Sequence, residues 1–369
     1  MCIVDRKFSL PPIASTGFAA MVCLDGISNG YLLNYLMSPD FDTYANRTDN
    51  SKGVAYPAIN DKHLYAALVP VPPLAEQRRI AERVSELMPL VGEHGKLEDE
   101  REALDASLPE RLRKSVLQMA VEGKLVPQDP SEEPASVLLD RIREERAHLI
   151  KEKKIKAPKG GESVIYLGSD GRRYEKRGKG EPVCIDDEIP FEIPEGWEWA
   201  RLEGITTYIQ RGKSPKYSLE KKYPVVAQKC NQWSGFSLER AKFVDPNSVA
   251  SYAEERLLVD GDLLWNSTGL GTLGRMAVYD SNQNPYGWAV ADSHVTVIRT
   301  VPDWLRYEYA FLYFAGPSVQ SVIEDQASGS TKQKELAQET VKRYLIPVPP
   351  LAEQRRIAER LNLILANIN

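Results

Sequence analysis

Two polar segments in the second half of the chain carry side chains suited to reading the bases of a nucleic acid. Residues 208–217 read YIQRGKSPKY, and residues 228–233 read QKCNQW. Amide side chains can form two hydrogen bonds with the adenine edge in the major groove, and arginine or lysine can do the same with guanine. A solvated polar loop would have a similar composition. The candidate contact residues in these segments are Gln210, Arg211, Lys213, Lys216, Tyr217, Gln228, Lys229, Asn231, Gln232 and Trp233.

A third polar segment, SGSTKQK at residues 328–334, adds hydroxyl groups and lysines. The formal net charge of the chain is −5, so any DNA-binding surface has to be local. Lys213, Lys229 and Lys332 are predicted to contact phosphates, which would make binding depend on salt. The remaining candidate contact residues are Asn266, Arg275, Ser330, Thr331, Lys332 and Gln333.

Two segments resemble catalytic or cofactor-binding motifs, but neither has the flanking structure or residues that the chemistry requires. Residues 269–274, GLGTLG, fit G-x-G-x-x-G, but a phosphate site needs a helix directly afterwards, and RMAVYD reads as a strand. A glycine-rich turn is the prediction. Asn284-Pro285-Tyr286 is one proline short of the adenine methyltransferase motif and reads as a loop. We therefore predict no catalytic residue and no metal site in this chain.

The four cysteines, Cys2, Cys23, Cys184 and Cys230, include no C-x-x-C pair. This usage favours a reducing compartment, the cytoplasm, over a disulfide framework. The apolar stretch of residues 8–24 follows two basic residues, but its prolines and glycine interrupt it too early for a signal peptide. The sequence contains no run of about 18 apolar residues, which a membrane helix would require.

One peptide, PVPPLAEQRRIAER, occurs twice, from residue 70 and again from residue 347. Each copy begins with an extended apolar lead and two prolines, which suit the first turn of a new helix. Apolar residues then recur at three- and four-residue spacing, so both copies are predicted to form amphipathic helices. The polar residues of the two copies are candidates for helix pairing or subunit docking, and a solvated helix face is the alternative. These residues are Glu76, Gln77, Arg78, Arg79, Glu353, Gln354, Arg355 and Arg356.

The first copy opens a region, residues 73–157, that is predicted to be mainly helical. Pro89, Gly92 and Gly95 predict a kink, and Ser107 can cap a further helical run that ends near Gly123. Another helix is expected at residues 134–155. Residues 158–188 are rich in lysine and glycine, and read either as a solvated basic linker or as a basic arm touching phosphates.

Residues 189–346 are predicted to form a mixed α/β domain. Strands are expected at residues 223–228, 262–265, 276–279 and 295–298, and a helix at residues 304–314. Residues 1–72 show the same order as the end of that domain: a strand at 19–24, a helix at 31–37 that ends before Pro39, a polar loop and the proline lead. On this alignment the first domain is incomplete, and residues 347–369 begin a distal helix. The chain is then either a fragment or shortened product, or another chain supplies the missing half.

The duplicated peptide, together with LRKSVLQMAVEGKL at residues 112–125, resembles the specificity subunit (HsdS) of type I restriction-modification enzymes, a host-defence family. The resemblance implies an α+β fold in which mixed α/β target-recognition domains are joined by long helices that form an antiparallel coiled coil. It implies that each domain reads half of a split double-stranded DNA target. The helices would dock two methyltransferase subunits and, through the complex, the restriction subunits.

The resemblance also implies that this chain is not catalytic and that S-adenosylmethionine, ATP and Mg²⁺ are held by the partner subunits. Two other classes compete with it. A coiled-coil scaffold that binds proteins would not be retained on DNA at moderate salt. A self-sufficient methyltransferase would bind S-adenosylmethionine itself. On the favoured interpretation, residues 190–346 bind DNA and residues 1–72 alone do not.

Overall fold

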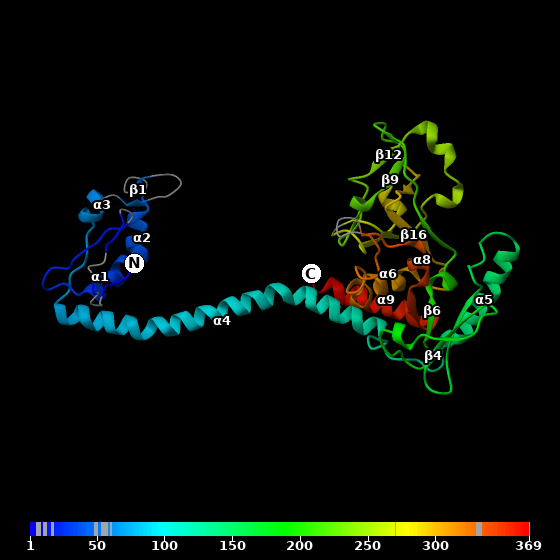
Figure 1. The fold of residues 1–369 in the computed structure, drawn as a ribbon, viewed down its shortest axis with the longest axis horizontal. Coiled ribbons are helices and arrows are strands. Elements are labelled where there is room, and N and C mark those ends of the chain that lie inside the picture. The colour runs from blue at the N-terminus through cyan, green and yellow to red at the C-terminus, as the bar shows by residue number, and fades with distance from the viewer. Residues whose placement is uncertain are drawn as a thin grey trace. The chain divides into compact units, whose positions relative to one another are not determined.

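The structure is a computed structural model in which two compact units are distinguished, Met1–Ala106 and Ser107–Asn369 (Figure 1). The boundary falls within one long helix, α4. The described residues are 1–4, 9, 13–15, 18–47, 51–52, 58–59, 61–269, 271–329 and 334–368. Among the described helices, none has both the length and the apolar character needed to cross a bilayer.

Helices and strands alternate irregularly along the chain, which confirms the mixed helix-and-sheet class. The α-helices are α1 Asn29–Leu36, α2 Pro39–Ala45, α3 Asp61–Ala66, α4 Leu74–Val121, α5 Ala135–Lys151, α6 Tyr307–Ala315, α7 Pro317–Gln320, α8 Gln338–Arg343 and α9 Leu351–Ala366. The 3₁₀ helices are η1 Asp186–Glu188, η2 Leu202–Ile205, η3 Gln228–Cys230, η4 Pro246–Ser251, η5 Glu254–Arg256 and η6 Ser281–Gln283.

The strands of the second unit form several small, mostly antiparallel sheets. One sheet has the order β14-β13-β16-β7 and another the order β15-β9-β12-β8, in which only β15 and β9 run parallel. The strands are β1 Ser51–Lys52, β2 Ala58–Ile59, β3 Ser163–Leu167, β4 Arg173–Arg177, β5 Val183–Cys184, β6 Glu198–Arg201, β7 Tyr208–Arg211, β8 Tyr217–Ser218, β9 Pro224–Val226, β10 Asn231–Gln232, β11 Gly235–Phe236, β12 Lys242–Val244, β13 Leu263–Asn266, β14 Met276–Val278, β15 Val290–Ala291, β16 Val295–Arg299 and β17 Leu345–Val348.

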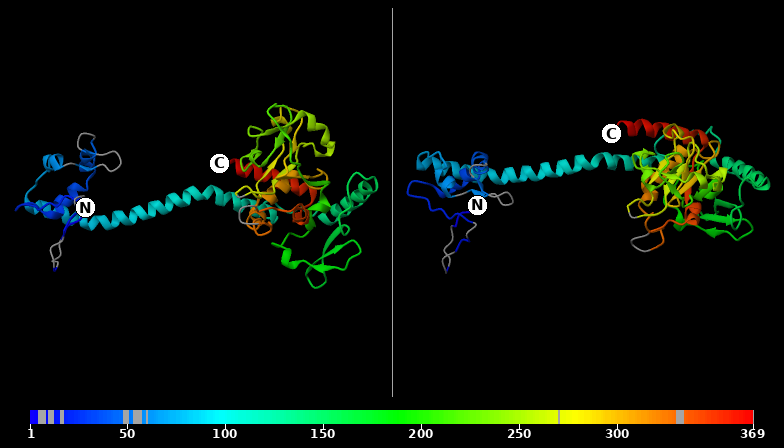
Figure 2. Two further views of the ribbon diagram at one scale, coloured as in Figure 1. Left: turned by 45° about the horizontal axis from the view of Figure 1, so that its top comes forward. Right: turned by 90° about the horizontal axis from the view of Figure 1, so that it is seen from above.

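The main core of the second unit is built from helices that are far apart in sequence. Leu117 and Val121 of α4, Leu138 of α5, and Ile357 and Leu361 of α9 belong to one apolar cluster, together with strands β6 and β17. Figures 1 and 2 show α9 running beside the last turns of α4 in the opposite direction. The end of the first predicted spacer helix and the start of the distal helix therefore share a core.

A glutamine in each copy of the repeated peptide joins that peptide to the domain helix before it. In the first unit, Gln77 Oε1 accepts the backbone N–H of Ser28, the residue that caps α1, at 2.8 Å. Gln77 Nε2 donates to the carbonyls of Gly26 at 3.0 Å and Pro72 at 2.8 Å. The Tyr31 hydroxyl donates to the carbonyl of Pro70 at 2.7 Å. Three of these four hydrogen bonds thus hold the first repeated peptide against α1 and the residues just before it, and the fourth lies within the peptide.

The second unit repeats the same contacts. Gln354 Oε1 accepts the backbone N–H of Arg306, which caps α6, at 2.9 Å. Gln354 Nε2 donates to the carbonyls of Trp304 at 3.5 Å and Pro349 at 3.1 Å. The hydroxyl of Tyr309 donates to the carbonyl of Pro347 at 2.9 Å. Helix α1 therefore corresponds to α6, as the sequence comparison of the two halves predicts. Helix α3 likewise occupies the place of α8 before the lead.

Several predicted elements are confirmed. Helices α1, α5, α6 and α9 and strands β9, β13, β14 and β16 fall on the predicted segments. Gly123 has a φ of 70°, which ends the helical geometry soon after Val121. Gly269 and the turn at residues 271–274 lead directly into β14, so the glycine-rich segment is a turn, with residue 270 outside the described residues.

Three predictions about elements are wrong. Helix α4 is assigned as continuous from Leu74 to Val121, so no separate helix starts at Ser107. Each internal proline removes only one backbone hydrogen bond, and ion pairs such as Arg101–Asp105 at 2.9 Å support the helix. Residues 19–24 form no strand, because the counterpart strand β16 pairs with β7 and β13, and the described part of residues 1–72 contains no strand in the place of either partner.

The third difference concerns the segment expected to be a basic linker. Residues 163–184 form a three-stranded antiparallel sheet, β3-β4-β5, in which Ser163 pairs with Arg177 and Leu167 with Arg173. Its dense charge concealed the alternation of inward and outward side chains that identifies a strand. The segment is a folded part of the second unit.

The Gln354 contacts generate a stability prediction. Gln354→Met keeps the volume of the side chain but leaves the Arg306 N–H and the Pro349 carbonyl without this partner. We expect a loss of about 2–4 kcal/mol in the free energy of unfolding of the second unit. Urea unfolding followed by tryptophan fluorescence measures it, because all 6 tryptophans lie beyond residue 106. The matched control, Arg360→Met on the exposed side of α9, should change the value by less than about 0.5 kcal/mol.

Candidate nucleic-acid interface

A short hairpin positions four of the predicted contact residues around one open hollow. Strands β10 and β11 pair Asn231 with Phe236 and Gln232 with Gly235, so Trp233 and Ser234 form the turn. Gly235 has a φ of 121°, a conformation that favours glycine. The hollow measures about 450 Å³ and is lined by Lys229, Gln232, Trp233, Ser234, Ser237, Glu239, Arg240 and Arg275. The structure thus brings Lys229, Gln232, Trp233 and Arg275 together.

The hollow is cationic and carries an exposed aromatic ring. Three basic residues line it, against one acidic residue, Glu239. Trp233 is 50% exposed although it is a large apolar side chain. A single exposed apolar side chain is common on protein surfaces, and here the indole is one of the side chains that line the hollow. Arg240, Ser234 and Ser237 also line the hollow but were not predicted from the sequence. The Ser-Gly-Phe segment after Trp233 could have indicated a turn there and so the exposure of its neighbours.

A hydrogen bond between Arg275 and Gln232 orients both side chains. Arg275 Nη1 donates to Gln232 Oε1 at 2.7 Å, and Arg275 Nη2 donates to the carbonyl of Gly271 at 3.0 Å. Gln232 Nε2 donates to the carbonyl of Lys229 at 2.9 Å. A guanidinium has five N–H donors and an amide nitrogen has two, so both groups keep donors for a ligand. A polar pair with fixed orientation and spare donors can read a base edge.

The hairpin rests on two buried amides. Asn231 Nδ2 donates to the carbonyl of Leu264 at 3.1 Å and to Asn266 Oδ1 at 2.9 Å. Asn266 Nδ2 donates to the carbonyl of Gln228 at 3.2 Å. Both residues are 0% exposed. The prediction that Asn231 and Asn266 contact DNA is therefore corrected: buried amides need internal partners, and these two hold the hairpin on strand β13.

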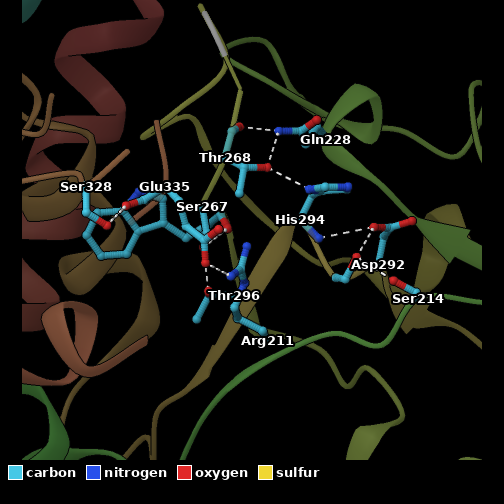
Figure 3. Close-up of polar contacts among 12 residues, drawn as sticks. Arg211, Ser214, Gln228, Ser267, Thr268, Asp292, His294, Thr296, Ser328 and Glu335 are labelled. Atoms are coloured by element: carbon cyan, nitrogen blue, oxygen red, sulfur yellow. Dashed lines mark hydrogen bonds and ion pairs between the residues drawn. The ribbon is translucent and has the colours of Figure 1, made fainter. Parts of the chain in front are cut away.

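Gln228 also bonds inward. Its Nε2 donates to the carbonyl and, at 3.1 Å, to the hydroxyl of Thr268. The hydroxyl of Thr268 meets His294 Nδ1 at 2.8 Å. Figure 3 shows this chain of polar contacts continuing to Asp292 and Ser214. Gln228 therefore positions the segment after β13 and differs from the exposed role predicted for it.

The serine, histidine and aspartate in this cluster are not arranged for nucleophilic catalysis. Asp292 Oδ1 accepts the backbone N–H of His294 at 3.1 Å and the hydroxyl of Ser293 at 3.1 Å. A catalytic triad needs the carboxylate on the imidazole ring, and here the ring nitrogen Nδ1 meets a threonine. Within the described residues, no group of His, Cys, Asp and Glu side chains is arranged to hold a metal ion.

The predicted contact residues of segment 208–217 lie on β7 and the loop after it. Arg211 forms an ion pair with Glu335, which is bridged to Ser328, so it anchors the base of the loop at 328–335 (Figure 3). Lys213 Nζ donates to Ser251 Oγ at 3.1 Å. Gln210 is half-buried and Lys216 is exposed. Ser330, Thr331, Lys332 and Gln333 lie outside the described residues.

Tyr217 is half exposed and keeps its proton over a wide pH range. Its hydroxyl donates to Asp292 Oδ2 at 2.9 Å. Partial burial and this hydrogen bond raise the pKa of Tyr217 to about 12. The ammonium group of Lys242 lies 4.6 Å from the centre of the ring. Tyr217 is thus a neutral hydrogen-bonding group beside a cation at the surface.

The second half of the chain is similar to a known protein family. Residues 194–369 match the family model described as the type I restriction modification DNA specificity domain. The chain is 30% identical over 260 residues to the type I restriction enzyme EcoAI specificity subunit of Escherichia coli, which covers 69% of this chain and 39% of that protein. It is 30% identical over 255 residues to the EcoEI specificity subunit of the same organism, covering 67% and 37%.

Residues 194–369 belong to the type I restriction-modification DNA specificity domain family. The chain spans less than half the length of these two curated relatives. A solved structure, that of the HsdS subunit from Thermoanaerobacter tengcongensis, aligns with a TM-score of 0.44 and 19% identity over 93% of this chain and 64% of that chain.

In this chain the residues of the repeated peptide divide into buried and exposed groups. Gln77 and Gln354 are fully buried and make the internal contacts described above, so their prediction as docking residues is corrected. Glu353 is also buried; it accepts Trp197 Nε1 at 2.9 Å and Gln128 Nε2 at 2.7 Å. Arg356 forms an ion pair with Glu132.

The other four motif residues lie at the helix surface. Glu76 and Arg79 form an ion pair, and Arg355 pairs with Glu359 at 2.7 Å. Arg78 and Arg355 are exposed and keep the role of candidate contact residues. The glutamine is therefore buried in both copies, whereas the glutamate before it is buried in the second copy, as Glu353, and lies at the surface in the first, as Glu76.

The buried carboxylate of Glu353 generates a pH prediction. Burial raises the pKa of Glu353, against the hydrogen bonds from Trp197 and Gln128. The folded state therefore holds a proton more tightly than the unfolded chain. As the pH rises from the ordinary carboxyl value through the raised one, the protein should lose about 1.4 kcal/mol of stability for each unit of the shift.

Glu353→Gln removes this dependence. The difference in unfolding free energy between Glu353→Gln and the parent should increase with pH in favour of the variant and then level off. Urea denaturation at a series of pH values measures it. Glu359→Gln, on the exposed side of the same helix, serves as the control with parallel curves. Parallel curves for Glu353→Gln as well would contradict the assignment.

Proposed function

We propose that the chain is a DNA sequence-specificity subunit of a type I restriction-modification system and that its second unit reads one half of a split target. The observation that carries the proposal is the hollow beside the hairpin at residues 231–236, where Arg275, just before β14, is bonded at 2.7 Å to Gln232 of the hairpin, next to the exposed Trp233. The family model covers this hairpin, and its description names DNA specificity.

The chemistry of the hollow matches a duplex with its major groove facing the hairpin. Arg275 can bond O6 and N7 of a guanine, and Gln232 can bond the edge of an adjacent adenine. Trp233 supplies apolar contact for a thymine methyl group or a sugar. Lys229 and Arg240 at the rim can contact phosphates, which fix the register without reading sequence.

The repeated glutamine contacts support a second recognition domain of the same kind. Gln77 and Tyr31 bind the first proline lead as Gln354 and Tyr309 bind the second. Equivalent local structure at both copies fits a protein that uses one module twice, once for each half of the target. Sequence-specific binding by this chain is assigned to residues 190–346, which contain the hairpin and the hollow beside it.

Methyltransferase subunits are the proposed partners of the helices, two in a complete complex, with restriction subunits joining through the complex. The exposed arginines Arg78 and Arg355 occupy the same position in the two copies and are the proposed contacts. Catalysis is assigned to those subunits, together with S-adenosylmethionine, ATP and Mg²⁺.

A selection experiment tests the proposal. Random double-stranded oligonucleotides are selected on the purified chain, and affinity is then measured for the recovered sequence and for a scrambled one. Arg275→Gln should lower the ratio of the two affinities by about 5- to 150-fold, because a bidentate base contact contributes about 1–3 kcal/mol of discrimination. Arg360→Gln, an exposed arginine on α9 outside the hollow, is the control with an unchanged ratio.

Two outcomes would reject the proposal. Selection that recovers no preferred sequence would remove the reading function, and loss of all retention on DNA at moderate salt would favour a protein-binding scaffold. An unchanged affinity ratio for both Arg275→Gln and Trp233→Ala would leave the hollow without a role in recognition.

A further inference from the structure

The sheet β3-β4-β5 and the end of helix α5 carry a second group of exposed cations, at a different place in the unit. Figure 1 shows β4 and α5 on the side of the second unit away from β9 and β12. Residues 151–179 contain ten lysines and arginines and four acidic residues. The sheet gives this charge a defined arrangement that the sequence alone did not reveal.

Glycines bring the two halves of this charged segment together. A Cβ on Gly161 would stand 2.7 Å from the Cα of Gly178, so the two backbones touch. Gly178 N donates to the carbonyl of Glu162 at 3.0 Å. Lys159 and Lys179 are close in sequence to these touching backbones and lie on the two segments that meet at this end of the hairpin. Five exposed lysines occur between the end of α5 and the residues after β4: Lys153, Lys156, Lys159, Lys176 and Lys179.

Two of the four acidic residues of the segment, Glu175 and Glu162, are bound to arginines, and the other two, Glu152 and Asp170, are exposed. Glu175 is buried and accepts from Arg201 at 2.7 Å, from Ser163 at 2.6 Å and from Arg177 at 2.8 Å. Burial alone would raise the pKa of Glu175, but these hydrogen bonds and charges keep it below its usual value, so the carboxylate stays ionised. Glu162 is held by the buried Arg146 at 3.2 Å.

The outward lysines keep their charge unmatched. Within the described part of the chain, none of these five lysines forms an ion pair. Lys154 is different, because it pairs with Glu152 at 2.8 Å. With Glu162 and Glu175 bound to arginines and Glu152 paired with Lys154, the five lysines without ion pairs give this segment a local excess of exposed positive charge on a protein of net charge −5.

The backbone at Lys153, one of these five lysines, has an unusual conformation. Lys153 has a φ of 59°, the left-handed conformation that follows the end of a helix and favours glycine. It is the one non-glycine residue with positive φ among the described residues. A cation at the end of a helix interacts favourably with the helix dipole, but that effect does not reach Lys159, Lys176 or Lys179.

We propose that this surface, the basic sheet patch formed by Lys153, Lys156, Lys159, Lys176 and Lys179, binds the phosphate backbone of double-stranded DNA independently of base sequence. Flexible exposed lysines with no fixed partner suit a regular row of phosphates better than a single matched site. The patch would add affinity without adding discrimination. It is separate from the reading hollow and does not depend on it.

The test removes the charge and measures the dependence of binding on salt. The patch variant carries Lys153→Gln, Lys156→Gln, Lys159→Gln and Lys179→Gln. The control variant removes the same charge from exposed helix positions of the same unit, with Arg111→Gln, Arg113→Gln, Lys114→Gln and Arg360→Gln. Affinity of the full chain for a duplex of scrambled sequence is measured at several salt concentrations, and circular dichroism verifies that both variants are folded.

Each phosphate contact contributes about 0.9 to the slope of log K against log salt. The patch variant should therefore have a slope smaller in magnitude by about 2–4, and the control variant by less than about 1. The ratio of affinities for target and scrambled DNA should not change in the patch variant. Equal changes in both variants would overturn the proposal, because they would report only net charge. An unchanged slope would overturn it too, and would point to an acidic protein as the partner.

This proposal and the proposed function can fail independently of each other. If the patch variant keeps the full slope while Arg275→Gln loses discrimination, this inference fails and the reading function stands. If the patch variant loses slope while no preferred sequence exists, the reading function fails and this inference stands.

Discussion

The structure depends on a buried glutamine amide that connects each repeated peptide to the helix before it. An amide has one strong acceptor and two donors, and Gln77 and Gln354 use all of them on backbone groups. The two prolines before each helix cannot donate backbone hydrogen bonds, so a side chain has to satisfy the carbonyls and the exposed N–H at this junction. The junction thereby holds the start of a long helix in a defined orientation to its domain.

The candidate reading surface is supported by the same kind of chemistry. Asn231 and Asn266 are buried amides that bind each other; Asn231 also donates to the carbonyl of Leu264 in β13, and Asn266 donates to the carbonyl of Gln228 just before the hairpin that has Trp233 at its turn. Gln232 and Arg275, which are half-buried and line the hollow, are oriented by the hydrogen bond between them. A contact surface whose side chains are held in place before binding loses less conformational entropy when it binds.

In the second unit, negative and positive side chains differ in burial. Carboxylates such as Glu175 and Glu353 are buried and held by specific donors, and many lysines remain at the surface. A net acidic protein can in this way present two local positive surfaces, the hollow near Arg275 and the basic sheet patch near Lys159. Local arrangement, rather than total charge, decides whether such a chain can approach a polyanion.

The sequence by itself determined the repeat, the amphipathic helices, the principal strands of the second domain and the polar segments that contain the candidate site. These features are local: proline pairs, three- and four-residue apolar spacing and β-rich runs act through neighbours in the chain. The same reasoning failed at residues 19–24, because a strand also needs partners from elsewhere. It failed at residues 158–188 as well, because charge hid a strand pattern.

Only the tertiary structure decided which polar side chains are exposed. Asn231 and Gln232 are adjacent amides, yet one is fully buried and the other lines the hollow. Successive side chains of a strand point to opposite faces, so composition alone cannot separate them. The pairing of Gln232 with Arg275 and the contact of the backbones at Gly161 and Gly178 also required the folded chain, since these residues approach one another only when segments distant in sequence pack together.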